Sequence, residues 1–293
     1  MPRIELGAVV EAFINWLLSV TAGLFEAISA VLTVLVEAIT AALTAPPFYL
    51  WIAVLGLVAL LARGVGLAVY TVVAFLLVAS MNLWPETMET LAVVLVAAVL
   101  ATAIGVPLGI WAAQRRGAST VLRPMLDFMQ TTPVFVYLIP AVFFFGIGVV
   151  PGVVATTVFS IPPAVRLTEL GIRGVDEEVV EAAHAFGAHP RQILREIQLP
   201  MALPTIMAGV NQVIMLALSM VVVAGLAGAG GLGSVVVQAV TQLDIAGGVE
   251  SGLAVVILAI FLDRVTASFA QRPARGLWRK LVPARQAPSP APA

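Results

Sequence analysis

Long apolar segments without charge alternate along the chain with short segments that carry most of the charged residues. A helix needs about 20 apolar residues to cross the hydrocarbon core of a bilayer. The pattern predicts about seven such helices: two shorter ones within 48–83 that turn at Arg63, one at 91–113, two between Asp127 and Arg166 that turn at 146–152, one at roughly 203–227 and one at roughly 247–267. We therefore expect an all-α fold, a polytopic membrane helix bundle that occupies residues 46–270.

Residues 5–45 carry a different pattern, a polar stripe on an otherwise apolar helix. Polar side chains recur there in steps of three, four or seven: Glu11, Asn15, Ser19, Glu26, Ser29, Thr33, Glu37, Thr40 and Thr44. A helix with one such stripe suits the plane of the membrane interface. We therefore predict that the region 1–45 is an amphipathic interfacial helix on the outer side, with a break near Gly23. The alternative is an eighth membrane span with buried glutamates.

Composition indicates that lipid is the solvent for much of the chain. Hydrophobic residues make up 61% of its 293 residues and charged residues only 11%, whereas soluble domains have about 25% charged residues. The chain has no cysteine, which excludes disulfides and thiolate metal sites. We expect membrane lipid as its surroundings and no nucleic-acid partner.

Basic residues predict the orientation, because cytoplasmic loops of membrane proteins are enriched in Lys and Arg. With the N-terminus outside, the inside regions and adjoining helix ends hold 14 of the 15 basic residues: Arg63, Arg115, Arg116, Arg123, Arg166, Arg173, Arg191, Arg195, Arg264, Arg272, Arg275, Arg279, Lys280 and Arg285. We therefore predict a multi-pass protein of the inner or plasma membrane with a cytoplasmic C-terminus. The basic, Pro/Ala-rich tail 271–293 is expected to be disordered, and its charge suits contact with anionic lipid.

The segment 166–202 gathers charge and helix punctuation on the predicted cytoplasmic side. Asp176 and the glutamates that follow it begin a helix at the end where negative charge is favourable. Gly187 can end that helix in the left-handed conformation, and Pro190 suits the first turn of a second helix. The pattern predicts two short helices that are joined by a hinge and exposed to the cytosol.

The spacing in this segment is EAA, three residues, G, nine residues, I, one residue and LP, which is similar to the EAA loop of ABC-importer permeases. The matching residues are Glu181, Ala182, Ala183, Gly187, Ile197, Leu199 and Pro200. In that family the loop carries the coupling helix, which docks into a groove on the ATP-hydrolysing subunit. The resemblance implies that residues from about Asp176 to His189, with His184 and Phe186 among them, contact the ATPase.

Further segments narrow the resemblance to one kind of permease. Residues 122–148 and 203–233, together with the amphipathic N-terminus, resemble the permease of the glycine betaine/proline betaine importers. The resemblance covers residues 5 to about 268. It implies a homodimer of permeases, two ATP-binding subunits that hold ATP and magnesium, and a separate extracytoplasmic substrate-binding protein. The chain itself is expected to bind no cofactor, to have no catalytic residues and to work by alternating access.

Polar residues inside the apolar segments are candidates for the translocation path. They are Gln130, Thr131, Thr132, Asn211, Gln212 and Ser219. Polar groups at membrane depth usually face protein or water. Hydrogen bonds between helices explain these residues equally well, so both interpretations stay open.

Three sequence motifs bear on enzymatic activity. GAGGLG at 228–233 matches the dinucleotide fingerprint, but it follows an apolar helix instead of a strand, so a flexible hinge or close helix packing is expected. Glu181 and His184 have the spacing of half a di-iron site, but a second copy of the motif is missing from the sequence, so we expect no metal. The ATP-binding pattern GxxxxGK[ST] does not occur, so we expect a partner to hydrolyse ATP.

Two other classes of transport protein are alternatives to an ATP-driven importer. A secondary transporter coupled to protons or sodium usually has an ionisable residue near the bilayer centre, whereas Arg63, Asp127 and Asp263 fall at predicted turns or helix ends. An osmotically gated channel would need no ATPase-docking loop. Among importers, the solute stays open between glycine betaine, proline betaine, carnitine, choline, an amino acid and other small zwitterions.

Overall fold

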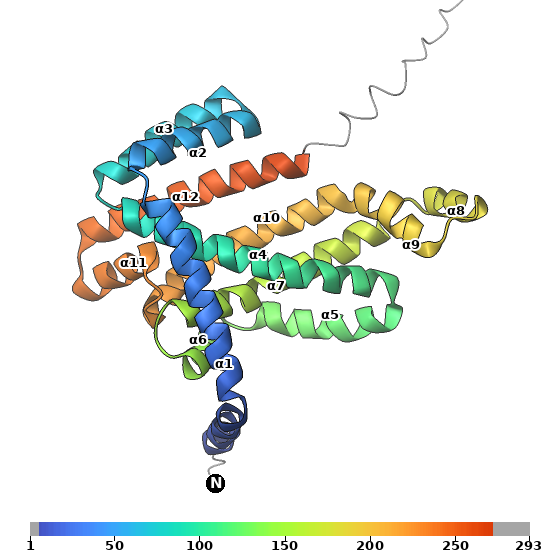
Figure 1. Ribbon diagram of the computed structural model, residues 1–293, viewed down its shortest axis with the longest axis horizontal. Helices are drawn as coiled ribbons and strands as arrows, with labels where there is room; N and C mark the ends of the chain where they lie inside the picture. The colour runs from blue at the N-terminus through green and yellow to red at the C-terminus, as the bar shows by residue number, and fades with distance from the viewer. Residues whose placement is uncertain (1–5, 272–293) are drawn as a thin grey trace, which may run out of the picture.

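The computed structural model describes residues 6–271, and nearly all of this range is helical (Figure 1). The α-helices are α1 (Leu6–Thr44), α2 (Phe48–Arg63), α3 (Val65–Ser80), α4 (Trp84–Gln114), α5 (Arg116–Thr131), α6 (Phe135–Phe145), α7 (Val149–Arg173), α8 (Glu177–Ala185), α9 (Pro190–Gln192), α10 (Leu199–Ala224), α11 (Gly231–Gln242) and α12 (Ile245–Gln271). A π-helical turn, η1 (Ile193–Gln198), precedes α10, and a 3-10 turn, η2 (Gly225–Ala227), follows it. The predicted all-α bundle is confirmed. Apart from Gln271, the predicted disordered tail lies outside the described residues.

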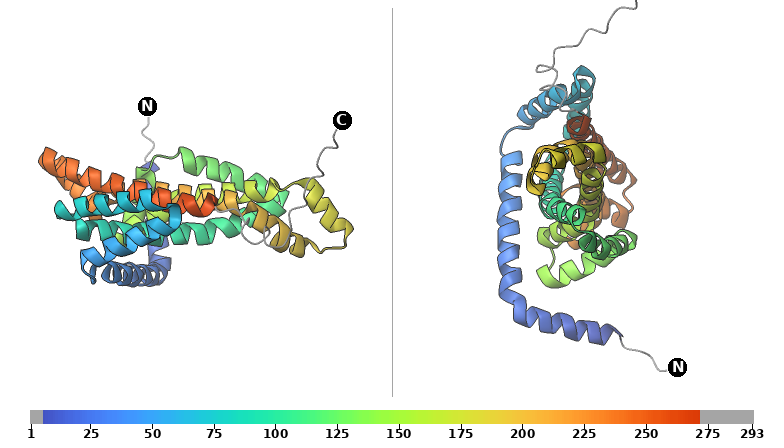
Figure 2. Two further views of the ribbon diagram at one scale, coloured as in Figure 1. Left: turned by 90° about the horizontal axis from the view of Figure 1, so that it is seen from above. Right: turned by 90° about the vertical axis from the view of Figure 1, so that its right-hand side faces the viewer.

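Helices α4, α7 and α10 lie side by side at the centre of the bundle (Figures 1 and 2). Their contacts use glycine and other small residues. A Cβ added to Gly105 would lie 2.5 Å from the Cβ of Ala164, and one added to Gly109 would lie 2.6 Å from the carbonyl oxygen of Val165. Small residues let helix backbones approach closely, which is how helices associate in a membrane. The α4–α7 contact therefore leaves no room for larger side chains.

Larger apolar side chains fill the space between this centre and the helices α3 and α12. Phe75 of α3 is fully buried, and its ring meets the ring of Phe261 of α12 edge-on at 5.3 Å between centroids. Met88 of α4 and Leu258 of α12 are also fully buried in the same cluster. The hairpin of α2 and α3 is thus held to the bundle through α12.

Helix α1 runs across the long helices instead of along them (Figures 1 and 2). Its Phe25 stacks on Phe144 of α6, with 4.8 Å between the ring centroids. The crossing direction fits the predicted interfacial helix, although Ile14–Thr44 is long and apolar enough to cross a membrane. Figure 2 shows α1 bending along its length, but the helix continues through Gly23, where the sequence analysis expected a break.

The number of full-length spans differs from the predicted seven. Among the described residues, five helices are long and apolar enough to cross a membrane, or six if the bent pair α5–α6 counts as one span. Helices α2 and α3 have 16 residues each. At 1.5 Å per residue each is about 24 Å long, which is short of a core about 30 Å thick. Gly64, with φ of 93°, separates the two helices and limits their length.

Two helical segments were not expected from the sequence. The predicted inside loop at 114–127 is mostly α5, which lies along α7 (Figure 1). Helix α5 ends where Thr132 is extended before Pro133, because a proline disfavours helical geometry in the residue before it. The chain then turns by 96° into α6. Helix α11 occupies part of the uncharged segment after the span predicted at 203–227.

Candidate functional site: the loop between α7 and α10

Two short helices between α7 and α10 form a loop at one end of the molecule (Figure 1). We call residues 176–198 the elbow. Its first helix, α8, begins at Asp176, whose carboxylate accepts a hydrogen bond from the backbone N–H of Glu178 at 3.0 Å. Such a cap satisfies an N–H that the first helical turn leaves free. The negative charge of Glu177 and Glu178 is also favourable at this end of the helix dipole, so the acidic residues determine where α8 begins.

A glycine reverses the chain after α8. Gly187 has φ of 79°, a left-handed conformation that glycine adopts readily and other residues adopt at a cost. The N–H of Gly187 donates to the carbonyl oxygen of His184 at 2.9 Å, and the N–H of Ala188 donates to that of Ala183 at 3.1 Å. These bonds satisfy carbonyl groups that the helix end leaves free. The predicted hinge is therefore a hydrogen-bonded helix end.

A reciprocal pair of hydrogen bonds begins the second helix, α9. The N–H of His189 donates to Oε1 of Gln192 at 2.9 Å, while Nδ1 of His189 accepts from the N–H of Arg191 at 3.3 Å. Pro190 occupies the first helical position, where a missing N–H has no consequence. The chain then passes through the π-helical turn η1 directly into α10. Such turns are rare in proteins, and those that occur are often found at functional sites.

Small and apolar side chains hold the elbow to the rest of the bundle. Ala183 of α8 and Ile193 of η1 are buried, and α8 packs against η1. Leu194 of η1 packs against a buried cluster that includes Ile172 of α7 and Ile206 of α10. A displacement of the elbow is therefore passed to α7 and α10 together.

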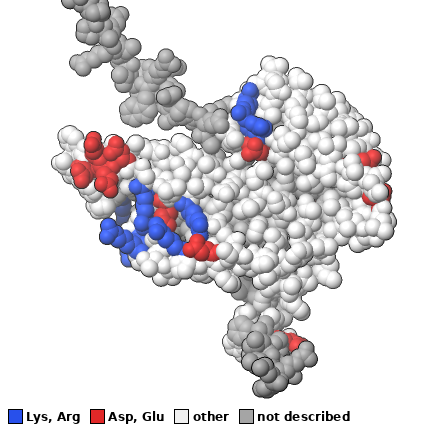
Figure 3. Space-filling view, turned by 180° about the vertical axis from the view of Figure 1, so that it is seen from behind, with Lys and Arg blue, Asp and Glu red and all other residues white. Residues whose placement is uncertain are grey.

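The outer surface of the elbow presents an exposed aromatic ring at the end of α8 and acidic side chains on α8 itself. Phe186 follows α8 directly and is 92% exposed. Four exposed acidic residues lie on α8 or cap it, namely Asp176, Glu177, Glu178 and Glu181, and Glu196 of η1 is exposed as well. Figure 3 shows charged side chains gathered at one end of the visible face, while most of that face is uncharged. An exposed aromatic ring rimmed by polar residues is typical of a protein-binding surface.

A basic cavity lies between the elbow and the end of α4. It has a volume of about 400 Å³, and its lining includes Arg115, His184, His189 and Arg191. The first turn of α8 is acidic by contrast. The elbow therefore offers a partner two regions of opposite charge.

The structure distributes the predicted loop residues over the elbow and its junction with α10. Glu181, Ala182, His184, Phe186 and Gly187 are exposed on α8 or just after it. Ala183 is only 8% exposed, which leaves little of it for contact with a partner. The junction residues Ile197 and Leu199 are half-buried and Pro200 is exposed.

The predicted path residues lie on α5, next to it and on α10. Four of the six are exposed in the chain: Gln130, Thr131, Gln212 and Ser219. Thr132 and Asn211 are half-buried. The Nδ2 group of Asn211 donates to Oδ1 of Asp263 at 3.0 Å, and its Oδ1 accepts from the hydroxyl of Thr266. These bonds join α10 to α12, so hydrogen bonding between helices accounts for the polarity of Asn211.

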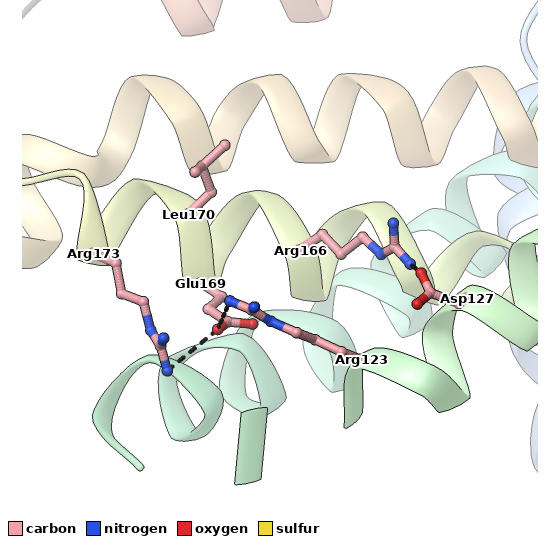
Figure 4. Close-up of a pocket in the computed structure, with 6 residues that line it drawn as sticks. All are labelled: Arg123, Asp127, Arg166, Glu169, Leu170 and Arg173. Carbon is pink, nitrogen blue, oxygen red and sulfur yellow. Dashed lines mark hydrogen bonds and ion pairs between the residues drawn. The ribbon is translucent and has the colours of Figure 1, made fainter. Parts of the chain in front are cut away.

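Sequence reasoning did not identify an ionic cluster between α5 and α7. Arg123 and Asp127 of α5 and Arg166, Glu169 and Arg173 of α7 line a cavity of about 310 Å³ (Figure 4). Within each helix, charges three or four residues apart share a face, and this signal is visible in the sequence. The pairing of the two faces is not, because it depends on how α5 packs.

The glycine-rich segment GAGGLG packs closely against its neighbours. A Cβ added to Gly225, just before it, would lie 2.3 Å from the carbonyl carbon of Gly233. The N–H of Gly231 donates to Oε2 of Glu89 and that of Leu232 to Oγ1 of Thr90, both at 2.8 Å. Helix α4 thus uses the N–H groups that a phosphate would need, which supports the close-packing interpretation. In the part of the chain that the structure describes, no three His, Asp or Glu side chains gather in a way that could hold a metal ion.

Comparisons with known proteins give this geometry a context. Residues 105–275 match the family model described as binding-protein-dependent transport system inner membrane component. The glycine betaine transport system permease protein OpuAB of Bacillus subtilis is 46% identical over 266 residues, which cover 91% of this chain and 94% of that protein. The glycine betaine/proline betaine transport system permease protein ProW of Escherichia coli is 45% identical over 263 residues, 90% of this chain and 74% of that protein.

Solved structures agree in fold. An inward-facing conformation of the MetNI methionine ABC transporter matches with a TM-score of 0.56 at 24% identity, over 64% of this chain and 95% of that one. The family model covers more than half of this chain and includes the whole elbow. The chain therefore belongs to the family of binding-protein-dependent transport system inner membrane components.

Proposed function

We propose that this chain is the permease subunit of an ATP-driven importer that takes up glycine betaine and proline betaine. The similar permeases from B. subtilis and E. coli are named for these solutes and match over at least nine tenths of the chain. The observation that carries the proposal is the elbow, where α8 has an acidic start and a nearly fully exposed aromatic ring at its other end. This is the surface that a partner needs if ATP is hydrolysed outside the chain.

The complex that we propose has two permease copies, two ATP-binding subunits and a separate extracytoplasmic substrate-binding protein. We place the elbow in the cytoplasm and the N-terminus outside, in agreement with the distribution of Lys and Arg. ATP and magnesium are held by the ATP-binding subunits. The permease contributes the docking surface and the path through the membrane.

The elbow transmits the nucleotide cycle to the membrane helices in this scheme. Closure of the two ATP-binding subunits on ATP moves both docked elbows. Because each elbow packs on α7 and α10 through Leu194, these helices reorient and open the path to the loaded receptor. Hydrolysis then returns the path to the inward-open state.

We assign the path to the exposed polar face of α5 and α10. Gln212 and Ser219 lie seven residues apart on α10, and both are exposed. Residues at this spacing share a helix face, and polar groups at membrane depth face protein or water. Gln130 and Thr131 extend the path at the end of α5, beside the half-buried Thr132.

Uptake into proteoliposomes tests the proposal. The permease is reconstituted with its ATP-binding subunit, ATP and magnesium are enclosed, and the binding protein is added outside with radiolabelled glycine betaine. We expect accumulation with ATP and none with ADP. Excess unlabelled proline betaine should compete more strongly than choline, because the related choline permease OpuBB of B. subtilis is only 31% identical.

Two outcomes would contradict the proposal. Uptake that needs no ATP and follows a proton or sodium gradient would indicate an ion-coupled secondary transporter. Flux that an osmotic shock alone releases would indicate a channel. ATP-driven uptake of carnitine, choline or an amino acid in place of the betaines would keep the importer and change only its solute.

A further inference from the structure

The ionic cluster between α5 and α7 has one buried member, Glu169. Its exposure is 5%, whereas the side chain of Arg123 is 61% exposed. A buried carboxylate is costly unless it is paired and hydrogen-bonded. Oε1 of Glu169 accepts from the hydroxyl of Ser119 at 2.7 Å. It also accepts from Nη2 of Arg123 at 3.2 Å and lies 3.3 Å from Nη2 of Arg173, as the dashed lines in Figure 4 mark.

The partners of Glu169 lie on α5 and α7, and one of them, Arg173, also contacts α4. Ser119 and Arg123 belong to α5, while Glu169 and Arg173 belong to the last turns of α7. Nη2 of Arg173 also donates to the carbonyl oxygen of Ala112 at 2.8 Å, in the last turn of α4. Glu169 therefore connects the ends of α4, α5 and α7 at one place. We call Ser119, Arg123, Glu169 and Arg173 the clamp.

The two clamp residues of α7, Glu169 and Arg173, lie directly before the elbow in the chain. Only Gly174 and Val175 separate Arg173 from Asp176, the residue that caps α8. The N–H of Gly174 donates to the carbonyl oxygen of Leu170 at 2.8 Å, and Val175 is buried. Because this connection is only two residues long and well ordered by these contacts, a displacement of α8 acts on the last turn of α7.

Helix α5 leads from the clamp to the bent part of the bundle. The break at Thr132–Val134 turns the chain by 96° into α6, and the candidate path residues Gln130 and Thr131 stand at the end of α5. A force that reaches α5 through the clamp therefore reaches the segment beside the proposed path.

We propose that Glu169 is a positioning residue that couples movement of the elbow to α5 and α6. Without its charge, α8 and α7 still move when ATP binds, but α5 no longer follows. The inference rests on the proposed function, since it assumes that an ATP-binding subunit moves the elbow. It predicts uncoupling: ATP is hydrolysed and little solute is transported.

The same cluster offers a matched control. Asp127 pairs with Arg166 across the same two helices, but its side chain is 65% exposed. Exposed ion pairs contribute little because water screens them. Asp127→Asn therefore makes the same chemical change as Glu169→Gln on the same cavity, at a site where we expect no effect.

Uptake and ATP hydrolysis by the complete complex in proteoliposomes test the clamp. For Glu169→Gln we expect hydrolysis to stay near the parent rate and the ratio of solute taken up to ATP hydrolysed to fall about tenfold, the loss that a hydrogen bond to a buried charge implies. Ser119→Ala removes one donor to the same carboxylate but leaves its charge and both arginine partners in place, so it should lower the ratio less, about threefold. Asp127→Asn should leave the ratio unchanged.

The result also has to separate the clamp from general damage and from the proposed function. A Glu169→Gln ratio equal to the parent's, or one lowered equally by Asp127→Asn, would overturn the inference. If Glu169→Gln does not assemble, the milder Ser119→Ala decides, and an unchanged ratio there counts against the clamp. A parent complex without ATP-driven uptake would instead refute the proposed function.

Discussion

Phe186 is the side chain through which the elbow should bind the ATP-binding subunit most strongly. Its ring is 92% exposed and follows α8 directly. Replacing it with alanine removes no packing inside the chain, so the permease should fold and insert as before. Phe186→Ala therefore isolates the contribution of the ring to the partner contact.

The size of the expected effect follows from the area of the ring. Complete burial of a phenylalanine side chain contributes roughly 1.5–3 kcal/mol. Since nearly all of this ring is free in the isolated chain, almost the full amount is available on docking. We expect Phe186→Ala to raise the dissociation constant for the ATP-binding subunit roughly 10- to 150-fold at one elbow.

Binding of the purified ATP-binding subunit to the permease in nanodiscs measures this effect, for instance by interferometry. Ile245→Ala serves as the matched control, because Ile245 is also a large apolar residue, 82% exposed, and it begins α12 far from the elbow (Figure 1). It should bind like the parent.

A dissociation constant for Phe186→Ala within twofold of the parent value would refute the reasoning. The elbow would then contact its partner through the acidic start of α8 or not at all. An equal loss with Ile245→Ala would point to damage common to both variants.

Three further predictions concern the elbow and the central contact. Gly187→Ala places a side chain at φ of 79°, which costs about 1–2 kcal/mol, and should weaken binding of the ATP-binding subunit. Gly117→Ala, at a site with open space around it, should bind like the parent, and equal affinities of the two variants would contradict the prediction. Because the chain has no cysteine, a single introduced cysteine can report contact with the ATP-binding subunit by cross-linking. Ala185→Cys should form cross-links and the buried Ala183→Cys should not; the reverse pattern would contradict the assigned faces of α8. Gly109→Ala puts a Cβ 2.6 Å from the carbonyl oxygen of Val165, and such overpacking destabilises the fold by about 1–3 kcal/mol. The unfolding temperature in detergent should therefore fall, whereas a temperature equal to that of Gly117→Ala would show that α4 and α7 can separate freely.

Local sequence patterns were sufficient to predict the elbow. A capping acid, a glycine with positive φ and a proline at the first helical position each act within a few residues, so Asp176, Gly187 and Pro190 define α8 and α9 without reference to the rest of the fold. The long apolar helices were predictable for the same reason, because hydrophobicity accumulates along consecutive residues. The sequence also placed the turn between α2 and α3 correctly, next to Gly64, but both helices were counted as spans although each has only 16 residues.

The clamp depends on neighbours that are distant in the sequence. Ser119 and Glu169 are 50 residues apart and meet only because α5 folds back along α7. Asn211 shows the same limit, since its polarity suited either a water-filled path or a partner until Asp263 and Thr266 were placed beside it. Residue types alone could not choose between these two interpretations.

The glycine contact between α4 and α7 restricts how the molecule can change shape. Two helices that come this close at Gly105 and Gly109 resist sliding past each other, because even an added Cβ at these positions would collide with the partner helix. The two helices should therefore move as one rigid body. Any gate that opens during a transport cycle then lies where the α4–α7 pair meets another polypeptide or the bent pair α5–α6.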